Sequence, residues 1–410
     1  MKFSTYLSIF LIGTCYSFLL INKIIFGITI SIGLITLIFL NKEFVYQNIK
    51  IHSKRINKIE LLVLFLFLSS FFFSAINSIK IERSLPVIIY LILIASFSFI
   101  LYLIFSRKKD YSSLLFKIFS ISFLVNSIIV SIYNYVNFDL SEFNEVIRFK
   151  GYLNIMTVLS ILIFFLSKSK LNFIPLIFLI PNIIISNCNS AILGIIIGTL
   201  LCLLFLLFKI FIKKSFVRIF AIPISFFCLF LLISFFIKNL PKEFSIKNTQ
   251  NFQFTIPKNL IDPHRQFIWG FSIEKIKQKP LFGYGQDTSN FIEGSQREIG
   301  SPYTGDMYFI PSHPHNFILE LLIETGFFGS FYFILFVYMI NYRIWKINNC
   351  NISRMYLIFF NGYFWSTSLV NFSFWLGWWQ ASYYLFLALI AVKMKNNQLN
   401  DSSEKEIKQN

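Results

Sequence analysis

The sequence predicts an all-α polytopic membrane protein with about twelve transmembrane helices and one large loop that contains short helices. Of the 410 residues, 56% are hydrophobic and only 14% are charged, whereas soluble domains carry about a quarter charged residues. The apolar residues fall in blocks of roughly 17 to 23, the length that a helix needs to cross the hydrocarbon of a bilayer. These blocks lack the alternation of a β-barrel, and a backbone in lipid must satisfy its own hydrogen bonds, so we expect helices.

The limits of the apolar blocks define the expected spans. The first block follows Lys2, lacks a small-x-small cleavage site and leads at once into a second block, so we expect an anchor and not a cleaved signal peptide. The expected spans are 3–21, 24–40, 61–79, 86–105, 113–133, 152–167, 171–186, 190–212, 216–237, 316–340, 355–371 and 374–392.

Basic residues in the short loops predict the orientation. The net charge of +18 comes mostly from Lys and Arg between the blocks, which indicates topology and not nucleic-acid binding, since basic loops stay in the cytoplasm. Both termini are then cytoplasmic. We expect spans with short loops over 1–237, an outer-face loop at 238–315 that bears any active site, further spans over 316–395, and a polar cytoplasmic tail at 396–410.

The first candidate site begins at the end of that loop. Pro314 suits the start of a helix, and His315 then lies at the outer mouth of a span. Asn316, Glu320 and Glu324 follow at spacings of four, which places them on one helical face. Carboxylates that face lipid are costly, so we expect these to face the bundle or a cavity. The alternative is an interfacial cap with glutamates that reach toward water.

The second candidate is the stretch 262–290. Apolar spacing predicts a helix over 265–276, too polar to cross a membrane and therefore lying on the outer surface. Arg265 near its start adds a guanidinium to the positive end of the helix dipole, a combination suited to phosphate. Arg265 alternatively pairs only with Asp262 or with a lipid headgroup. The chain has no GxxxxGK[ST], HExxH or GxSxG motif, so ATP, zinc or serine hydrolysis is unsupported.

Two motifs together resemble one family. The run from His315 to Gly329 reads H-N-x9-G-x-x-G, which is similar to a signature of the O-antigen ligase and O-antigen polymerase group. Arg265, Trp269 and the PLFGYG run at 280–285 look like the R…W…P-x-x-G-x-G segment of the same group. The likeness extends to 151–154 and 378–380, and it is strongest over 260–330.

The resemblance implies a glycan transferase of the bacterial inner membrane, with its active site on the periplasmic side. The donor would be a glycan on undecaprenyl diphosphate, and the acceptor would be lipid A-core in ligases or another lipid-linked glycan in polymerases. His315 would be the general base and Arg265 would hold the diphosphate, with no metal or cofactor. We expect a ligase more than a polymerase. A transporter without covalent chemistry is the rival, although the spans have mostly apolar centres.

One departure from the family concerns its second Arg near residue 190, where this chain has Asn189. An amide supplies no charge, so another cation is needed. Arg83 and Arg148 are candidates for substrate binding, although each alternatively contacts a headgroup or a loop carboxylate, and Arg297 is expected in solvent.

The sequence also predicts where several other polar and aromatic residues near the motifs lie. We expect Asn316, Glu324 and His313 beside the substrate, with His313 orienting the turn and its ring directed elsewhere than that of His315. His264 is expected in a solvated loop. The tryptophans at 375, 378 and 379 are expected to form an interfacial belt, with stacking on sugar rings as the alternative.

Overall fold

The computed structural model describes residues 2–139, 146, 148–167, 169–211, 240, 256–258, 261–300 and 304–409. Within these residues the regular elements are helices, and the only extended pairing is an isolated bridge between Glu298 and Tyr308. The predicted all-α class is therefore confirmed.

The first half of the chain is a succession of helices with short connections. They are α1 (Phe3–Gly13), α2 (Cys15–Ile21), α3 (Lys23–Leu40), α4 (Lys42–Ser53), α5 (Lys58–Ile76), α6 (Ile81–Arg107), α7 (Lys109–Asn137), α8 (Lys150–Leu166), the 3-10 turn η1 (Lys170–Phe173), α9 (Ile174–Ile185) and α10 (Asn189–Phe211). The second half holds α12 (Pro263–Gln278), the turn η3 (Ser289–Phe291), α13 (Phe317–Trp345), α14 (Asn351–Ser368) and α15 (Gly377–Gln409).

Six described helices are long and apolar enough to cross a membrane, namely α3, α5, α6, α7, α10 and α13. A seventh span arises if α1 and α2, which meet at an angle of 50°, count as one. The polytopic membrane class is confirmed, while the total of about twelve stays a prediction. The span expected at 216–237 lies outside the described residues.

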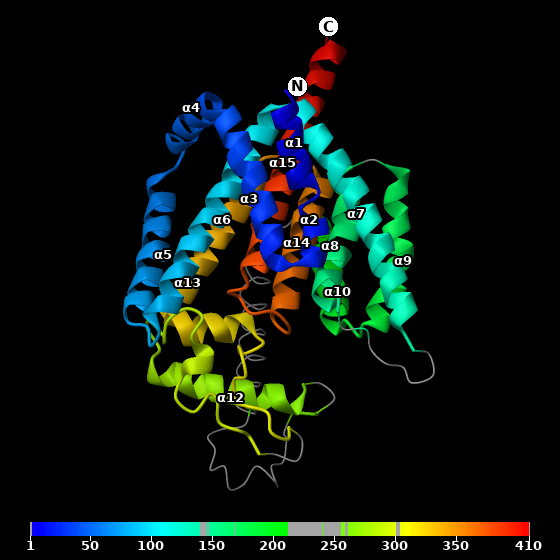
Figure 1. Ribbon diagram of the computed structural model, residues 1–410. Coiled ribbons are helices and arrows are strands. Elements are labelled where there is room, and N and C mark those ends of the chain that lie inside the picture. The colour runs from blue at the N-terminus through cyan, green and yellow to red at the C-terminus, as the bar shows by residue number, and fades with distance from the viewer. Residues whose placement is uncertain are drawn as a thin grey trace.

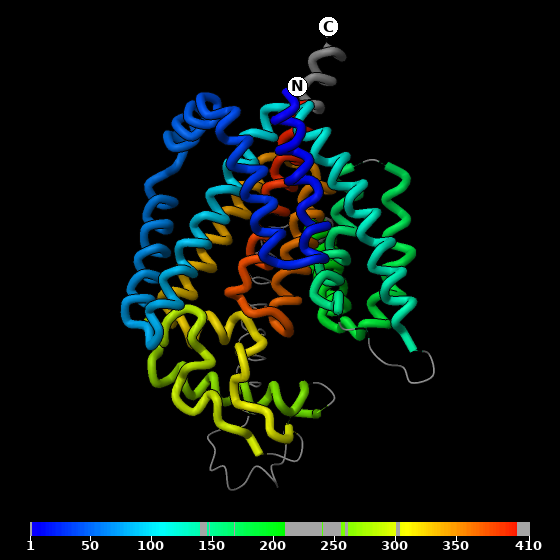
Figure 2. The backbone as a smooth tube through the Cα atoms, in the orientation of Figure 1, coloured from blue at the N-terminus to red at the C-terminus, as the bar shows by residue number. Residues whose placement is uncertain are grey.

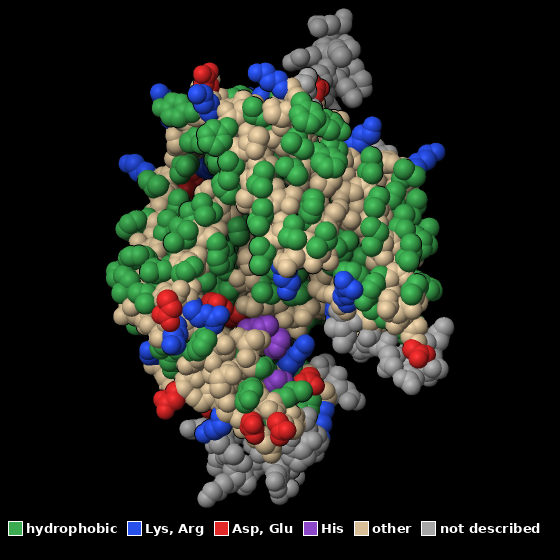
Figure 3. Space-filling view, in the orientation of Figure 1, with side chains coloured by type: hydrophobic (Ala, Val, Ile, Leu, Met, Phe, Trp, Pro, Cys, Tyr) green, Lys and Arg blue, Asp and Glu red, His purple; other side chains and the backbone are tan. Residues whose placement is uncertain are grey.

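The helices form one bundle, and α12 lies across one end of it (Figure 1). Both termini lie at the opposite end, where the expected polar tail continues as helix α15 to Gln409. The backbone trace in Figure 2 shows the segment between α12 and α13 gathered at the same end as α12. Hydrophobic side chains cover the flank of the bundle, and most Lys and Arg lie toward its two ends (Figure 3).

The described part of the outer-face loop has its own small core. The predicted helix at 265–276 is confirmed as α12, and the Asp262 carboxylate caps it by accepting from the backbone N–H of His264 at 3.0 Å. Buried apolar side chains of α12 and the following turns pack on Ile323 of α13, which joins the loop to the span. The core residues are Phe267, Ile268, Phe271, Tyr284, Ile292, Ile299, Phe309, Ile310 and Ile323.

Helix α13 is kinked at Gly326, where φ is 65° and ψ is −170°. The kink frees backbone groups that then pair with the turn after α12. Phe327 N–H donates to the Pro280 carbonyl at 2.8 Å, and Gly285 N–H donates to the Glu324 carbonyl at 2.8 Å. The two motifs that resemble one family are therefore a single unit, paired backbone to backbone.

Candidate active site

A pocket of about 540 Å³ lies where α12 meets the bundle. It brings together His315 and Arg265, the two residues predicted to be catalytic. Figure 3 shows the histidine side chains of this face gathered at that junction. The lining residues come from α8, the start of α10, α12 and four connecting segments, and they are Lys150, Asn187, Asn189, Ser190, Leu193, Asp262, His264, Arg265, His315, Val370 and Asn371.

His315 is held from the main chain. Its Nδ1 lies 3.3 Å from the carbonyl oxygen of Asn371, in the loop between α14 and α15. A carbonyl oxygen only accepts, so this contact assigns the ring proton to Nδ1 and leaves Nε2 with a lone pair. His315 also has φ of 51°, in the left-handed region that non-glycine residues rarely adopt. Such strain is often found at functional sites.

His313 contacts the same carbonyl oxygen, through Nε2 at 3.1 Å. The two imidazole centroids are 4.1 Å apart, so the expectation that the rings point to different places is wrong. The left-handed backbone at His315 turns the chain back on itself and brings both rings to Asn371. Ser312 Oγ lies 2.9 Å from Nδ1 of His313, which completes the hydrogen bonding of that ring.

Both imidazoles are neutral at neutral pH. Burial lowers the pKa of His315 to about 4, and repulsion from Arg265, and from His313 when that ring is protonated, adds to this shift. Burial likewise lowers the pKa of His313. A neutral imidazole with a lone pair directed away from its hydrogen-bond acceptor can receive a proton.

Arg265 supplies positive charge at the start of α12. Its guanidinium is half-buried, and within the described residues it makes no hydrogen bond or ion pair, including none with Asp262. The Asp262 carboxylate instead accepts from the backbone N–H of Arg265 at 3.3 Å. A half-buried guanidinium at a helix N-terminus is a binding site for an anion such as phosphate.

Two hydrogen bonds fix α12 relative to the segment that carries His315. Trp269 Nε1 donates to the carbonyl oxygen of Pro314 at 3.0 Å, one helical turn after Arg265. His264 Nε2 lies 2.9 Å from the carbonyl oxygen of Tyr308, so His264 is half-buried at the pocket where a solvated position was expected.

Lys150, at the start of α8, is a lining residue that sequence reasoning missed. It lies at the same pocket as Asn189, the residue that stands where the family has a second Arg. The signal that could have found it is its place directly before the Gly151 segment, which carries part of the resemblance. The pocket therefore contains a second cation beside Arg265.

Arg83 and Arg148 do not line the pocket. The guanidinium of Arg83 lies 3.6 Å from the carboxylate of Asp287 and over the ring of Phe291. Arg148 lies over the rings of Tyr133 and Phe149. Arg83 thus pairs with a loop carboxylate, the alternative that the sequence left open, whereas Arg148 contacts aromatic rings and no described carboxylate.

The polar residues of α13 hold the loops and do not line the pocket. Asn316 caps the helix by accepting from the backbone N–H of Ile318 at 3.1 Å. Glu324 is buried, and its carboxylate accepts from three consecutive backbone N–H groups at 287–289, at 2.6, 3.1 and 2.8 Å. Glu320 is buried and accepts from Ser373 Oγ at 2.5 Å. Both carboxylates are buried away from lipid, as expected, but they face loop segments and not the pocket.

Asn371 is itself anchored, because its Nδ2 donates to Ser190 Oγ at 3.0 Å, and Ser190 donates to Asn154 Oδ1 at 3.0 Å. The tryptophans at 375, 378 and 379 lie in the hydrophobic core next to this loop. The expected interfacial belt is wrong, since these indoles pack between helices. Among the described residues no group of three or more His, Cys, Asp or Glu is placed to hold a metal ion.

Comparison with known proteins agrees with the family that these motifs suggest. Residues 174–334 match the family model described as O-antigen ligase. The resemblance to the O-antigen ligase family is confirmed. The O-antigen ligase match includes both Arg265 and His315, while Lys150 and Asn371 lie outside it.

Curated relatives agree with this family. Proteins of Rickettsia conorii and Rickettsia felis, each named "Putative polysaccharide ligase", are 33% identical over 141 residues, and one of Rickettsia typhi is 33% identical over 144 residues. The aligned part covers 34% of this chain and 34% of each relative. The chain is thus similar to these relatives over about a third of their length.

Proposed function

We propose that this protein is an O-antigen ligase-like glycosyltransferase, which moves a glycan from undecaprenyl diphosphate to a sugar hydroxyl of lipid A-core. The observation that carries the proposal is one pocket that contains a neutral imidazole at His315 and, at Arg265, a half-buried guanidinium with no ion pair among the described residues. The O-antigen ligase match supports the same chemistry. The basic loops favour the bacterial inner membrane with the pocket on the periplasmic side and both termini in the cytoplasm.

In this mechanism His315 Nε2 accepts the proton of the acceptor hydroxyl. The acceptor oxygen then forms a bond to the anomeric carbon of the donor sugar, and the bond from that carbon to the diphosphate oxygen breaks. Negative charge grows on the departing undecaprenyl diphosphate, and Arg265, with Lys150 nearby, stabilises it. No nucleotide, metal ion or cofactor takes part in the proposed reaction.

Donor binding would also adjust the base. Burial lowers the pKa of His315 to about 4, and nearby positive charge adds to this shift. A bound diphosphate brings negative charge, which favours the protonated imidazole and raises the pKa of His315 toward neutrality. A general base acts best when its pKa lies near the working pH. Substrate binding would therefore bring the pKa of His315 closer to the value that suits a general base.

The decisive experiment uses the purified protein in nanodiscs, with undecaprenyl-diphosphate glycan and lipid A-core present together. Mass spectrometry identifies which lipid anchor carries the enlarged glycan. Glycan on lipid A-core supports the ligase proposal. Longer glycan still on undecaprenyl diphosphate would make the protein a polymerase with the same donor, and the absence of any product would contradict both reactions.

Variants then test the assigned residues at equal membrane levels. We expect His315→Ala and Arg265→Ala each to lose about a hundredfold or more of the transfer rate, because each removes a group acting at the reacting atoms. Arg297→Ala is the matched control, since Arg297 is exposed over the ring of Phe309 and away from the pocket. Equal activities of the Arg265 and Arg297 variants would remove Arg265 from the site.

A further inference from the structure

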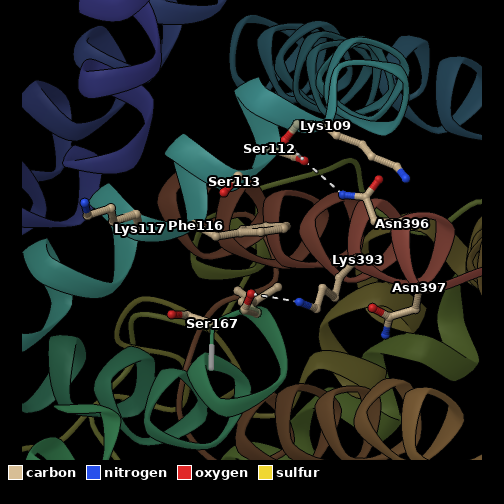
Figure 4. A pocket seen from close by; sticks show the side chains of 10 residues that line it. Lys109, Ser112, Ser113, Phe116, Lys117, Ser167, Lys393, Asn396 and Asn397 are labelled. Carbon is tan, nitrogen blue, oxygen red and sulfur yellow. Dashed lines mark hydrogen bonds between the residues drawn. The ribbon is translucent and has the colours of Figure 1, made fainter. Parts of the chain in front are cut away.

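A second pocket, of about 350 Å³, lies at the end of the bundle opposite the candidate active site (Figure 4). It is formed by the first turns of α7, the end of α8 and the last part of α15 that leaves the bundle. Its lining residues are Lys109, Ser112, Ser113, Phe116, Lys117, Leu166, Ser167, Lys393, Asn396 and Asn397.

The lining is rich in cations and hydrogen-bond donors. Among the residues whose side chains the structure describes, it holds three lysines and no Asp or Glu, together with serine hydroxyls and asparagine amides. In Figure 4, Lys109 and Lys393 approach from α7 and α15, whereas the ammonium of Lys117 extends away from them. Asp110, the acidic residue of the first turn of α7, is not among the lining residues.

The polar side chains around the pocket are held in position. Lys393 Nζ donates to the Leu166 carbonyl at 3.2 Å, at the end of α8. Asn396 Nδ2 donates to Ser112 Oγ at 2.9 Å, which ties α15 to the start of α7. Asn396 Oδ1 is buried and has no hydrogen-bond partner among the described residues.

The start of α7 adds a further attraction for anions. Lys108 precedes the helix without a side-chain cap, so the first backbone N–H groups of α7 lack helical acceptors near the pocket. The positive end of the helix dipole therefore lies on the same side as the lysines. Phe116 and Leu166 provide an apolar wall beside these polar groups.

We propose that this pocket binds a phosphate ester, and that the ester is the headgroup of an anionic phospholipid in the adjoining leaflet. Lysine ammoniums, hydroxyls and the N–H groups at a helix start match the oxygens of a phosphodiester, and the apolar wall suits the glycerol carbons next to it. Basic pockets between transmembrane helices on the cytoplasmic side bind such headgroups. The basic loops predict that this end faces the cytoplasm. The site is separate from glycan transfer at the other end.

The test follows the thermal unfolding midpoint of the purified full-length protein in detergent. Dioleoyl-phosphatidylglycerol, dioleoyl-phosphatidylcholine and glycerol 3-phosphate are titrated separately. We expect a saturable rise with phosphatidylglycerol that phosphatidylcholine does not reproduce. The apparent Kd should weaken about fivefold for each lysine removed, first in Lys109→Gln and then in the double variant with Lys393→Gln.

Controls separate a built site from general surface charge. Lys50→Gln removes an exposed lysine of α4, which does not line the pocket, and should keep the parent Kd. Lys109→Gln leaves the bond from Lys393 to Leu166 intact, so it reports on binding even if the double variant does not fold. No response to phosphatidylglycerol, or equal losses in the Lys50 and Lys109 variants, would overturn the proposal. Saturation by glycerol 3-phosphate at the same concentration would support the phosphate site and overturn the lipid as its source.

Discussion

The Nδ1 atom of His315 lies 3.3 Å from the carbonyl oxygen of Asn371, and this contact joins the start of α13 to the loop between α14 and α15. The acceptor is a main-chain atom, so the ring orientation depends on the path of that loop. Glu320, one turn further along α13, holds the same loop through the backbone N–H of Phe374 at 2.6 Å. The proposed base and its support thus belong to one packed region.

The first prediction concerns pH. Because burial and neighbouring charges lower the pKa of His315 to about 4, the neutral imidazole persists well below pH 6.5 and is lost only as the pH falls through the lowered pKa. The pH dependence of kcat/KM for glycan transfer reports the ionisation of the free enzyme. We expect its acidic limb, where kcat/KM falls as the pH drops, to lie at a pH well below the usual pKa range of histidine. His313→Asn removes a neighbouring charge and should move that limb upward.

The control for this measurement is His52→Asn. His52 lies in α4, against the rings of Phe99 and Tyr102 and outside the pocket, so the limb should not move. A parent limb at or above pH 6.5 would contradict the lowered pKa.

A second prediction separates two neighbouring cations. Lys150→Gln should raise the KM for the lipid-linked donor about fivefold to tenfold, because it removes one charge from the pocket proposed to bind the diphosphate. Arg148→Gln, two residues earlier, should leave KM unchanged, since Arg148 lies over Tyr133 and Phe149. Steady-state kinetics at varied donor concentration measure both, and a larger effect at Arg148 would reverse the assignment.

A third prediction concerns stability. Glu324→Gln puts an amide donor where one carboxylate accepts from three backbone N–H groups at 287–289. We expect a loss of about 2 kcal/mol in the free energy of unfolding, the cost of unsatisfied buried groups. Thermal or denaturant unfolding measures it. Glu293→Gln, at an exposed position, should leave the free energy of unfolding unchanged. An unchanged free energy of unfolding in Glu324→Gln would show that the Glu324 carboxylate does not hold the loop.

A fourth prediction compares two glycines with nearly the same φ. Gly326 and Gly300 have φ of 65° and 64°. A Cβ on Gly326 would lie 2.3 Å from the carbonyl of Leu281, whereas one on Gly300 would meet no described atom within 4 Å. Gly300→Ala should cost about 1 kcal/mol for backbone strain alone.

Gly326→Ala should cost far more, because α13 and the turn after α12 would have to separate. The amount of folded protein in the membrane and its thermal midpoint measure both variants. Similar losses of stability in the two variants would show that the backbone at Leu281 moves away from the added Cβ without an energetic cost.

Much of the fold could be predicted because its signals are local. Span length and polarity reveal the long helices, and Pro263 with its apolar spacing reveals α12. Local patterns could not show the break at Thr14, since the apolar run continues through it. Lys150 and Asn371 reach the pocket from α8 and from the loop after α14. Their convergence with His315 depends on helix packing, which residue spacing does not contain.

The pairing of 280–285 with α13 around Gly326 also limits how this protein can be recombined with its relatives. Phe327 bonds to Pro280 and Gly285 bonds to Glu324 through main-chain atoms, so the outer loop and the start of the span meet without a linker between them. A chimera that takes its loop from one parent and α13 from another must form these main-chain hydrogen bonds between segments from different proteins. A chimera in this region should therefore take the whole block from Pro263 through Ser330 from one parent.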